Sequence, residues 1–464
     1  MRSTPALSAR DGLARLAGYP YAILTWVNGD GYPVSVAIHA AIDIGAGSAA
    51  FTGPAGLTLP TDRDVSLTGS HIRPQPGFGY DERRHVTVWG RVAADPAGLD
   101  RFILRGTRAW GWDEAETPFF EYSERAVGQS RRYFDALTAE RGTPVRPRLS
   151  FGWLTLRATR LPFLSATFVP VLIGIAIAAS HDRFDLPTAL LTVLGAAFVH
   201  LGINVSNDVF DATLGADDVN VTPTQYSGGS RVIQYGLVSL PRMAAISALF
   251  FAAAAVVGLT LMALRGSQAL LAIGVLGFVL GIGYTAPPLK LVYRGLGEIA
   301  VAVGFGPLML LGAYVVQTRG ALSWEALAAS VPVAVLVALI LYVNEIPDRR
   351  GDAHAGKRTL PVRLSPAAVV RLYEVSIAAA FASVVVSVAL GALPVTALVI
   401  LLAIPLALRV RDGLAPNYDN PYGLMAIMGV NIRLHLVVGV LLLVAYAAVL
   451  VAGAVAPGLP LFLR

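Results

Sequence analysis

The chain has 464 residues, of which 55% are hydrophobic and 14% are charged. Ordinary soluble domains carry about 25% charged residues, so this composition favours a polytopic membrane protein over a soluble enzyme. There are no cysteines, which excludes disulfides, thiolate metal sites and cysteine nucleophiles. The net charge of +6 comes almost entirely from arginine, and we expect no nucleic-acid partner.

The charged residues are spread unevenly along the chain. Of the 36 lysines and arginines, 19 fall in residues 1–162 and 17 in the remaining 302 residues, and long apolar runs begin only after about Phe163. The amino-terminal stretch "MRSTPALSARDGLARL" lacks the apolar core of a secretory signal. These features predict a soluble domain over residues 1–148 and a membrane domain over residues 149–464.

The first 100 residues predict a small antiparallel β-barrel. Short runs rich in valine, isoleucine, threonine and aromatic residues alternate with turn sequences such as "NGDGYP" and "PQPGFG"; the runs are "YAILTWV", "PVSVAIHAAID", "SAAFTG" and "HVTVWGRVAA". Asn-Gly and Asp-Gly between two such runs indicate a hairpin. Residues 97–140 are predicted to be helical from "LDRFILRGTRAW" and "EYSERAVGQSRRYFDAL", and "RGTPVRPRLS" is predicted to be a linker.

The rest of the chain predicts an all-α polytopic membrane bundle, because a spanning helix needs about 20 mainly apolar residues. We expect about nine spans, at roughly 163–180, 188–207, 243–264, 268–284, 297–317, 327–344, 368–390, 394–408 and 432–453. If the N-terminal domain is cytoplasmic, the cytoplasmic loops hold 13 Lys and Arg residues and the opposite side holds four. The positive-inside rule therefore places this domain on the cytoplasmic side of a bacterial cytoplasmic membrane.

A first acidic segment, "NVSNDVFDATLGAD", follows the second apolar run. At 100° per residue, Asn204, Asn207, Asp208 and Asp211 project from one face of a helix. Apolar neighbours of these residues suggest that the face lines a cavity within the protein. A polar helix end in water is the alternative interpretation.

A second acidic segment, "YVNEIPDRRGDAHAGKRTLPVRL", follows the sixth apolar run and contains Asn344, Asp348 and Asp352 at i, i+4 and i+8. Pro347 is predicted to kink or restart the helix. Carboxylates gathered in one site repel unless a cation joins them. Because Mg²⁺ takes one or two carboxylates together with phosphate oxygens, the two segments predict a site for Mg²⁺ and a diphosphate.

A third polar segment, "GYTAPPLKLVYRGLGE", lies between the fourth and fifth apolar runs and offers Tyr284, Lys290 and Arg294. Its Pro-Pro pair predicts a break in helical structure. The alternative interpretation is a simple connector whose long basic side chains reach back to the membrane surface.

Taken together, these segments resemble the UbiA-type intramembrane prenyltransferase superfamily from "RLPF" at Arg160 to the last apolar run. "NDVFD" matches the first acidic motif of that family, and "DRRGD" matches the second. The chain most resembles the 1,4-dihydroxy-2-naphthoate, or menaquinone, branch in "NDVFDATLGAD", "GGSRVIQYGLVS" and "YTAPPLKLVYRGLGE", with Gly215 where the ubiquinone-type branch usually has an acid. A soluble N-terminal domain is a departure from this family's core enzyme.

The resemblance implies an enzyme that uses Mg²⁺ to transfer an isoprenoid from a polyprenyl diphosphate to an aromatic acceptor. The menaquinone branch implies 1,4-dihydroxy-2-naphthoate as this acceptor, with loss of its carboxyl group as CO₂. The implied metal-binding and catalytic carboxylates are Asp208, Asp211, Asp348 and Asp352. Tyr284 would face the allylic cation, and Lys290 would orient the acceptor. The implied substrate-binding residues are Asn204, Asn207, Arg231, Arg294, Asn344, Lys357 and Arg358.

The N-terminal barrel resembles the pyridoxamine-phosphate-oxidase-like split barrel, which is a flavin-binding fold. This resemblance implies FMN as a cofactor, with Arg63, Arg73 and Arg83 as candidate phosphate ligands. The alternative is a degenerate barrel that serves dimerisation or regulation and so forms a homo-oligomer.

Three other functions remain open from the sequence. One is a UbiA-type enzyme with a specialised or lipid acceptor. Another is a secondary transporter, which would also have acids near broken helices, although such acids are expected near the middle of the membrane. The third is a flavin-dependent reductase that the membrane domain anchors.

Overall fold

The computed structural model describes residues 7–54, 56, 58–74, 80–96, 98, 100–145, 149–456 and 460–463. It divides into two units, Met1–Tyr133 and Phe134–Arg464. Most of the predicted turn "PQPGFG" and the centre of the predicted linker "RGTPVRPRLS" lie outside the described residues.

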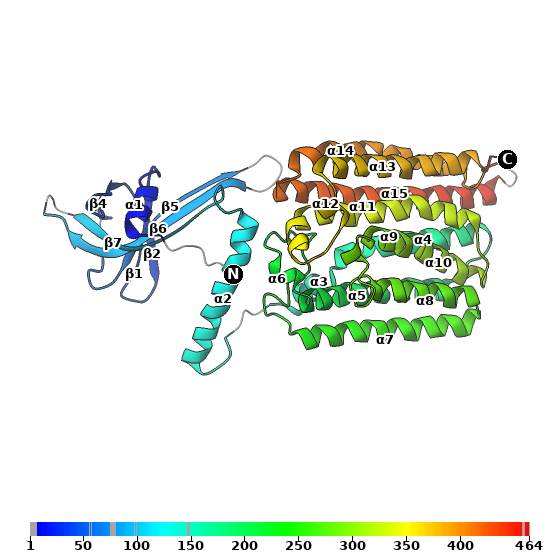
Figure 1. Ribbon diagram of the computed structural model, residues 1–464, viewed down its shortest axis with the longest axis horizontal. Coiled ribbons are helices and arrows are strands. Elements are labelled where there is room, and N and C mark those ends of the chain that lie inside the picture. Colours follow the sequence, from blue (N-terminus) through cyan, green and yellow to red (C-terminus); the bar gives the residue numbers. More distant parts are fainter. Residues whose placement is uncertain are drawn as a thin grey trace. The chain divides into compact units, whose positions relative to one another are not determined.

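The N-terminal unit is a seven-stranded antiparallel sheet (Figure 1). Its strands are β1 (Ala22–Val27), β2 (Pro33–Ile38), β3 (Ala40–Asp43), β4 (Ser48–Thr52), β5 (Val65–Pro74), β6 (Tyr80–Ala94) and β7 (Arg101–Asp113), in the order β2-β1-β5-β6-β7-β4-β3. Only His39 separates β2 from β3 in the chain, although these strands occupy opposite ends of the sheet. The sheet must therefore curl until its ends approach each other, which makes it a half-barrel.

The core of this unit forms from alternate residues of the strands, as expected for a sheet with one buried face. Leu24, Leu67, Val88 and Leu104 are fully buried there, and Leu13 of helix α1 (Ala9–Leu16) packs into the same cluster. The four predicted strand runs are thus confirmed as strands, with "PVSVAIHAAID" divided between β2 and β3.

The prediction of a helix in "LDRFILRGTRAW" is wrong, because residues 101–110 of this stretch lie in strand β7. Leu104 lies opposite Val92, and Ala109 lies opposite Val88, in the ladder that β7 forms with β6. Cross-strand pairing and burial of one face outweigh the local helical preference. The second predicted helical stretch is confirmed as α2 (Phe119–Arg141), within which the boundary between the two units falls.

The second unit is helical, and Figure 1 shows its long helices running side by side. Its elements are α3 (Phe151–Thr159), η1 (Leu161–Leu164), α4 (Ser165–Ser180), α5 (Leu186–Thr213), α6 (Ala216–Val219), α7 (Leu240–Arg265), α8 (Gln268–Gly283), η2 (Val292–Arg294), α9 (Gly297–Val303), η3 (Gly304–Leu308), α10 (Met309–Thr318), α11 (Trp324–His354), α12 (Leu360–Arg363), α13 (Pro366–Ala389), η4 (Val395–Ala403), α14 (Ile404–Asn417) and α15 (Pro421–Val455).

The predicted number of nine spanning helices is not confirmed. Within the described residues, six helical stretches are long and apolar enough to cross a membrane: α5, α7, the continuous run α9–η3–α10, α11, α13 and α15. Helices α4 and α8 are apolar but shorter. The predicted span at 394–408 is a 3₁₀ helix, η4, followed by α14, which begins with Pro405 at its first turn. Proline favours such a restart because it lacks a backbone N–H.

Two long helices, α5 and α11, carry the acidic segments. Asp185 caps the start of α5 by accepting a hydrogen bond from the Thr188 amide at 3.0 Å, and Ser323 caps α11 in the same way. The predicted restart of the helix at Pro347 is wrong, because α11 continues to His354. Neighbouring elements allow a proline inside a membrane helix, and the carbonyl of Pro347 accepts a hydrogen bond from the Thr222 hydroxyl at 3.1 Å.

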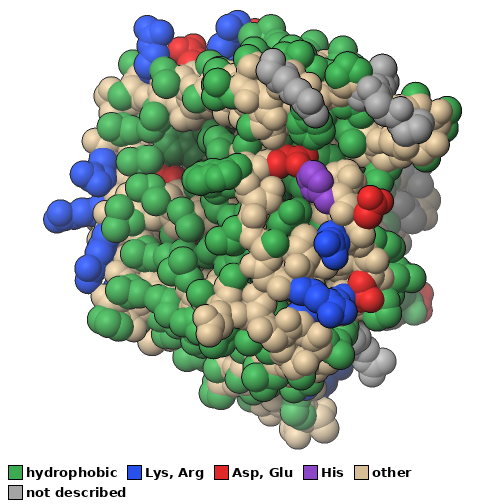
Figure 2. Space-filling model, turned by 90° about the vertical axis from the view of Figure 1, so that its right-hand side faces the viewer, with side chains coloured by type: hydrophobic (Ala, Val, Ile, Leu, Met, Phe, Trp, Pro, Cys, Tyr) green, Lys and Arg blue, Asp and Glu red, His purple; other side chains and the backbone are tan. Residues whose placement is uncertain are grey.

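Large apolar side chains cover much of the outer surface of the helical unit. On α7, Leu249, Val256 and Leu259 are each about two-thirds exposed. Figure 2, which looks onto one end of the structure, shows extensive hydrophobic surface with charged side chains only in small groups. Such a surface suits a bundle surrounded by lipid.

Candidate active site

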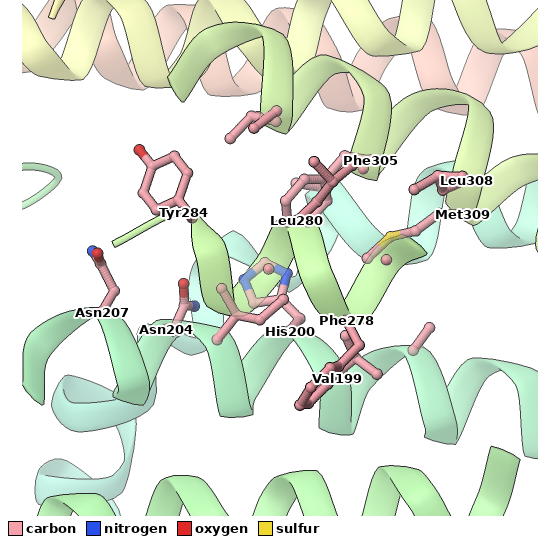
Figure 3. A pocket seen from close by; sticks show the side chains of 18 of the residues that line it. Val199, His200, Asn204, Asn207, Phe278, Leu280, Tyr284, Phe305, Leu308 and Met309 are labelled. Atoms are coloured by element: carbon pink, nitrogen blue, oxygen red, sulfur yellow. The ribbon is translucent and has the colours of Figure 1, made fainter. Parts of the chain in front are cut away.

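The helical unit encloses a cavity of about 770 Å³ that is lined by α4, α5, the helices from α7 to α11 and the segments that connect them. Figure 3 shows Asn204, Asn207 and Tyr284 on one part of its wall and Phe278, Leu308 and Met309 on another. The cavity is therefore amphipathic, with polar side chains gathered at one end. It suits a ligand with a charged head and an apolar tail.

Helix α5 directs three of its predicted residues into this cavity, because they recur at one face of the helix. Asn204, Asn207 and Asp211 all line the wall. The Asn207 side-chain oxygen accepts a hydrogen bond from the Thr285 hydroxyl, and the Asp211 carboxylate accepts one from the Tyr293 hydroxyl at 3.0 Å.

Asp208 lies on α5 beside these residues but is not among the residues that line the cavity in the described structure. Its carboxylate accepts a hydrogen bond from the Arg160 guanidinium at 2.8 Å and from the Ser230 backbone amide at 3.3 Å. Arg160 does line the cavity. The geometry thus makes Asp208 the group that holds Arg160 in position.

Asp217 on α6 is a cavity residue to which the sequence assigned no role. Gly215 ends α5 with φ at +77°, a conformation that glycine adopts readily, and so turns the chain back towards the cavity. Burial and the charges of Asp211 and Asp208 raise the pKa of Asp217 well above its usual range. One of its carboxylate oxygens has no hydrogen-bond partner among the described residues.

Helix α11 contributes Asn344, Asp348 and Asp352 to the cavity wall from across the bundle. Asp348 accepts hydrogen bonds from the Asn220 amide at 2.9 Å, the Ser227 hydroxyl at 3.1 Å and one further backbone amide at 2.8 Å. The structure therefore brings the two acidic segments to the same end of one cavity.

Lys357 connects the two segments. Its ammonium lies 2.8 Å from Asp211 and 3.9 Å from Asp352, and it lies 5.2 Å from the centre of the Tyr293 ring. Burial alone would lower the pKa of Lys357, but the charges of Asp211 and Asp352 outweigh it and raise that pKa above its usual value. Lys357 is therefore a fixed cation at the polar end of the cavity.

Four basic residues predicted to bind substrate or acceptor do not line the cavity in the described part of the chain. Arg231 is buried and donates to the backbone carbonyl of Asp217. The Lys290 ammonium lies over the Tyr293 ring, 5.4 Å from the ring centre. Arg294 donates to the carbonyl of Pro288 at 2.8 Å, and Arg358 is exposed.

The three arginines proposed for a flavin phosphate are all engaged in ion pairs. Arg63 pairs with Asp62 at 3.3 Å, Arg83 pairs with Glu114 at 2.5 Å, and Arg73 pairs with two acidic side chains. A phosphate would have to displace these carboxylates to form charge-assisted hydrogen bonds. These three arginines therefore do not form a free phosphate site, and the predicted FMN is not supported.

The cavity and its surroundings define the class of the protein: a helical membrane bundle with one deep site for an amphipathic anion. Residues 167–432, more than half of the chain, match the UbiA prenyltransferase family. The chain belongs to this family. The match begins at residue 167, so the N-terminal unit lies outside it.

Relatives of known name agree with the predicted branch. The chain is 29% identical to the 2-carboxy-1,4-naphthoquinone phytyltransferase of Synechocystis sp. over 298 residues, which are 63% of this chain and 92% of that protein. It is 34% identical to the 1,4-dihydroxy-2-naphthoate octaprenyltransferase of Mycobacterium tuberculosis over 255 residues, which are 54% of this chain and 83% of that protein. The predicted family and its menaquinone branch are thereby confirmed.

A solved UbiA homologue from Archaeoglobus fulgidus bound to GPP and Mg²⁺ covers 64% of this chain and 99% of its own length, at 16% identity and a TM-score of 0.42.

Proposed function

We propose that the chain is an integral membrane prenyltransferase that moves an isoprenoid from a polyprenyl diphosphate to an aromatic acceptor. The amphipathic cavity, with carboxylates and Lys357 at one end and apolar walls beyond them, supports this proposal most strongly. The names of the two relatives support 1,4-dihydroxy-2-naphthoate as the acceptor, and hence a place in menaquinone biosynthesis.

The residues at the polar end fit Mg²⁺ by their chemistry. Mg²⁺ prefers oxygen ligands and needs only one or two carboxylates when phosphate oxygens complete its shell. Asp211, Asp217, Asp348 and Asp352 would hold it, and the unpartnered oxygen of Asp217 supports this assignment. In the described part of the chain, no three acidic or histidine residues are grouped tightly enough to hold a metal alone. A bound Mg²⁺ would neutralise charge on the diphosphate and so make it a better leaving group.

The chain's own cations would hold the diphosphate in place. Lys357 and Arg160 both line the cavity and carry charge beside the acidic residues. Their hydrogen bonds to diphosphate oxygens would stabilise the charge that develops as the bond between C1 of the isoprenoid and oxygen breaks. Asn204, Asn207 and Asn344 would orient these groups and the substrate.

The remaining wall would protect and direct the allylic cation. Tyr284 lies between the polar and apolar parts of the wall (Figure 3), where its ring face would stabilise a positive charge. Apolar residues of α7, α8 and α10 would enclose the prenyl chain and exclude water, which would otherwise capture the cation. The new bond then forms between C1 and an electron-rich ring carbon of the acceptor.

The sidedness of the reaction is part of the proposal. The excess of Lys and Arg in one set of loops supports a cytoplasmic position for both the N-terminal unit and the polar end of the cavity.

Purified protein in lipid vesicles, supplied with a polyprenyl diphosphate, Mg²⁺ and 1,4-dihydroxy-2-naphthoate, tests the proposal directly. The expected products are prenylated naphthoquinol, inorganic diphosphate and CO₂, identified by mass spectrometry. A panel of other phenolic acceptors tests the choice of acceptor. Vesicles that take up substrate without forming any prenylated product would support a transporter instead and contradict the proposal.

A further inference from the structure

A pair of buried glutamates, one on α9 and one on α11, is not used by the mechanism above. Glu345 on α11 is 5% exposed and lines the cavity, and Glu298 on α9 is 7% exposed. Among the described residues, no amide, hydroxyl or cationic group donates a hydrogen bond to Glu345, and its carboxyl lies against that of Glu298. Burying an unsatisfied carboxylate is costly unless a ligand satisfies it.

The surroundings of Glu345 separate it from the four aspartates assigned to Mg²⁺. The charge that acts on it most strongly is that of Glu298, and Asp352 and Lys357 have smaller effects. Tyr284 and Tyr342 are its titratable aromatic neighbours. Glu298 is fixed, because one of its oxygens accepts a hydrogen bond from the Leu360 amide at 3.3 Å.

We infer that Glu345 binds the aromatic acceptor through a ring hydroxyl and accepts its proton during transfer, while Glu298 positions Glu345. This inference rests on the proposed function and adds the group that recognises the acceptor. Glu345 therefore selects acceptors that have a free phenolic hydroxyl over acceptors in which this hydroxyl is an ether.

The step balances as follows. The C1–O bond of the prenyl diphosphate breaks, and the diphosphate leaves with the electron pair of that bond. A ring carbon of the acceptor forms the new C–C bond to C1. The hydroxyl O–H bond breaks, its electron pair moves towards the ring as a C=O bond forms, and the proton goes to the Glu345 carboxylate. Glu345 is suited to this task because it lines the cavity, no amide, hydroxyl or cation among the described residues occupies its carboxyl, and general bases act from within hydrogen-bond reach.

The test uses the full chain in lipid vesicles and compares E345Q with E325Q. Glu325 lies on the same helix, is also largely buried and pairs with His181, outside the residues that line the cavity. For E345Q we expect kcat to fall about 10²- to 10³-fold, with KM for the prenyl diphosphate unchanged. E325Q should retain the activity of the unaltered protein, and E345D, which keeps a carboxylate, should be intermediate.

Two further measurements separate proton transfer from a structural role. The unaltered protein should lose rate at low pH as Glu345 takes up a proton, and E345Q should lack this limb of the profile. E298Q should move the limb to lower pH, because it removes a like charge beside Glu345. A methyl ether at the hydroxyl that Glu345 contacts should slow the unaltered protein strongly and E345Q little further.

The outcomes are distinguishable. Undiminished transfer by E345Q, or a loss of prenyl diphosphate binding in both E345Q and E345D, would overturn this inference while leaving the proposed function intact. Absence of transfer by the unaltered protein with every acceptor would overturn both.

Discussion

The two acidic segments reach the same cavity, but the structure stabilises them differently. In the first segment, residues 204–217, the carboxylates of Asp208 and Asp211 each contact a cationic side chain, Arg160 and Lys357 respectively. In the second segment, residues 344–357, the hydrogen bonds to Asp348 come from uncharged donors.

This difference indicates where a bound cation matters most. Cationic partners offset negative charge directly, whereas neutral donors solvate a carboxylate without cancelling its charge. Lys357 belongs to the second segment in sequence but contacts Asp211 of the first at the shorter distance. If the proposed Mg²⁺ site is correct, we therefore expect the second segment to depend more strongly on the bound ion than the first.

The largest effect is expected for Asp348→Asn. The change removes a charge that no cationic side chain among the described residues contacts directly. We therefore expect initial rates of prenyl transfer to fall about 10³-fold, in the range for loss of preorganised electrostatic stabilisation. Initial rates with labelled prenyl diphosphate, over a series of Mg²⁺ concentrations, measure this loss of activity. Asp419→Asn is the matched control, because Asp419 is exposed and pairs with Arg349. Equal rates for the two variants would contradict the assignment.

Replacing Lys357 is expected to have the next largest effect. Lys357→Met removes the cation that bridges the two segments, so KM for the prenyl diphosphate should rise by about 10- to 100-fold, the scale of a lost charge-assisted contact. Lys357→Arg should recover part of the affinity. Lys290→Met should change this KM little, because the Lys290 side chain lies outside the cavity lining. A similar rise for both methionine variants would show that net charge, and not position, matters.

Asp208→Asn should affect stability more than it affects chemistry. Breaking the pair leaves Arg160 without its charged partner, at a cost of about 2–3 kcal/mol for a mostly buried pair. Thermal melting in detergent measures the loss. The double variant with Arg160→Met should melt at a higher temperature than Asp208→Asn alone. If the stability losses of the two single variants simply add up in the double variant, the pairing is contradicted.

A change at the apolar end should alter chain-length preference and leave the acidic end intact. Gly274 on α8 lines the cavity, and a Cβ atom added there meets no atom within 4 Å. Gly274→Phe should slow transfer of long prenyl diphosphates several-fold more than short ones, because the ring occupies part of the apolar cavity. Gly453→Phe, on α15 and outside the cavity lining, is the control. An equal effect on all chain lengths would place the prenyl chain elsewhere.

The smallest effect is expected from the partly exposed pair of His181 and Glu325, which lies outside the cavity lining among the described residues. His181 donates to Glu325 at 2.7 Å, and this hydrogen bond raises the pKa of His181. The pair therefore adds stability below about pH 6.5, the value for the unfolded chain, and loses it as pH rises through the folded pKa. Since His181 is nearly half exposed, its contribution should stay below about 1 kcal/mol. Melting of His181→Gln across this pH range checks the sign, and a larger deficit at high pH would contradict it.

Much of the site follows from sequence because helix periodicity is local. The spacing of Asn204, Asn207 and Asp211 predicts a shared face, and these three residues do line one cavity. The partner of Asp208 does not follow from spacing, because Arg160 reaches it from 48 residues earlier in the chain. Glu345 gave no signal of its own, since an isolated glutamate beside an asparagine matches no motif.

The wrong predictions about secondary structure also arise from contacts between residues distant in the chain. "LDRFILRGTRAW" has a local pattern compatible with a helix, but its pairing with β6 depends on residues that precede it by up to a full strand and turn. Pro347 predicts a break from local chemistry, yet α11 continues because packing and the contact with Thr222 accommodate the proline. Tertiary contacts decided both cases.

We expect both acidic segments to act on one diphosphate in one cavity. The most direct test measures prenyl transfer by the purified protein with a polyprenyl diphosphate, Mg²⁺ and 1,4-dihydroxy-2-naphthoate. It compares the unaltered chain with the Asp211→Asn and Asp348→Asn variants. We expect prenylated product from the unaltered chain and severe loss in both variants. Full activity in either variant would contradict the claim.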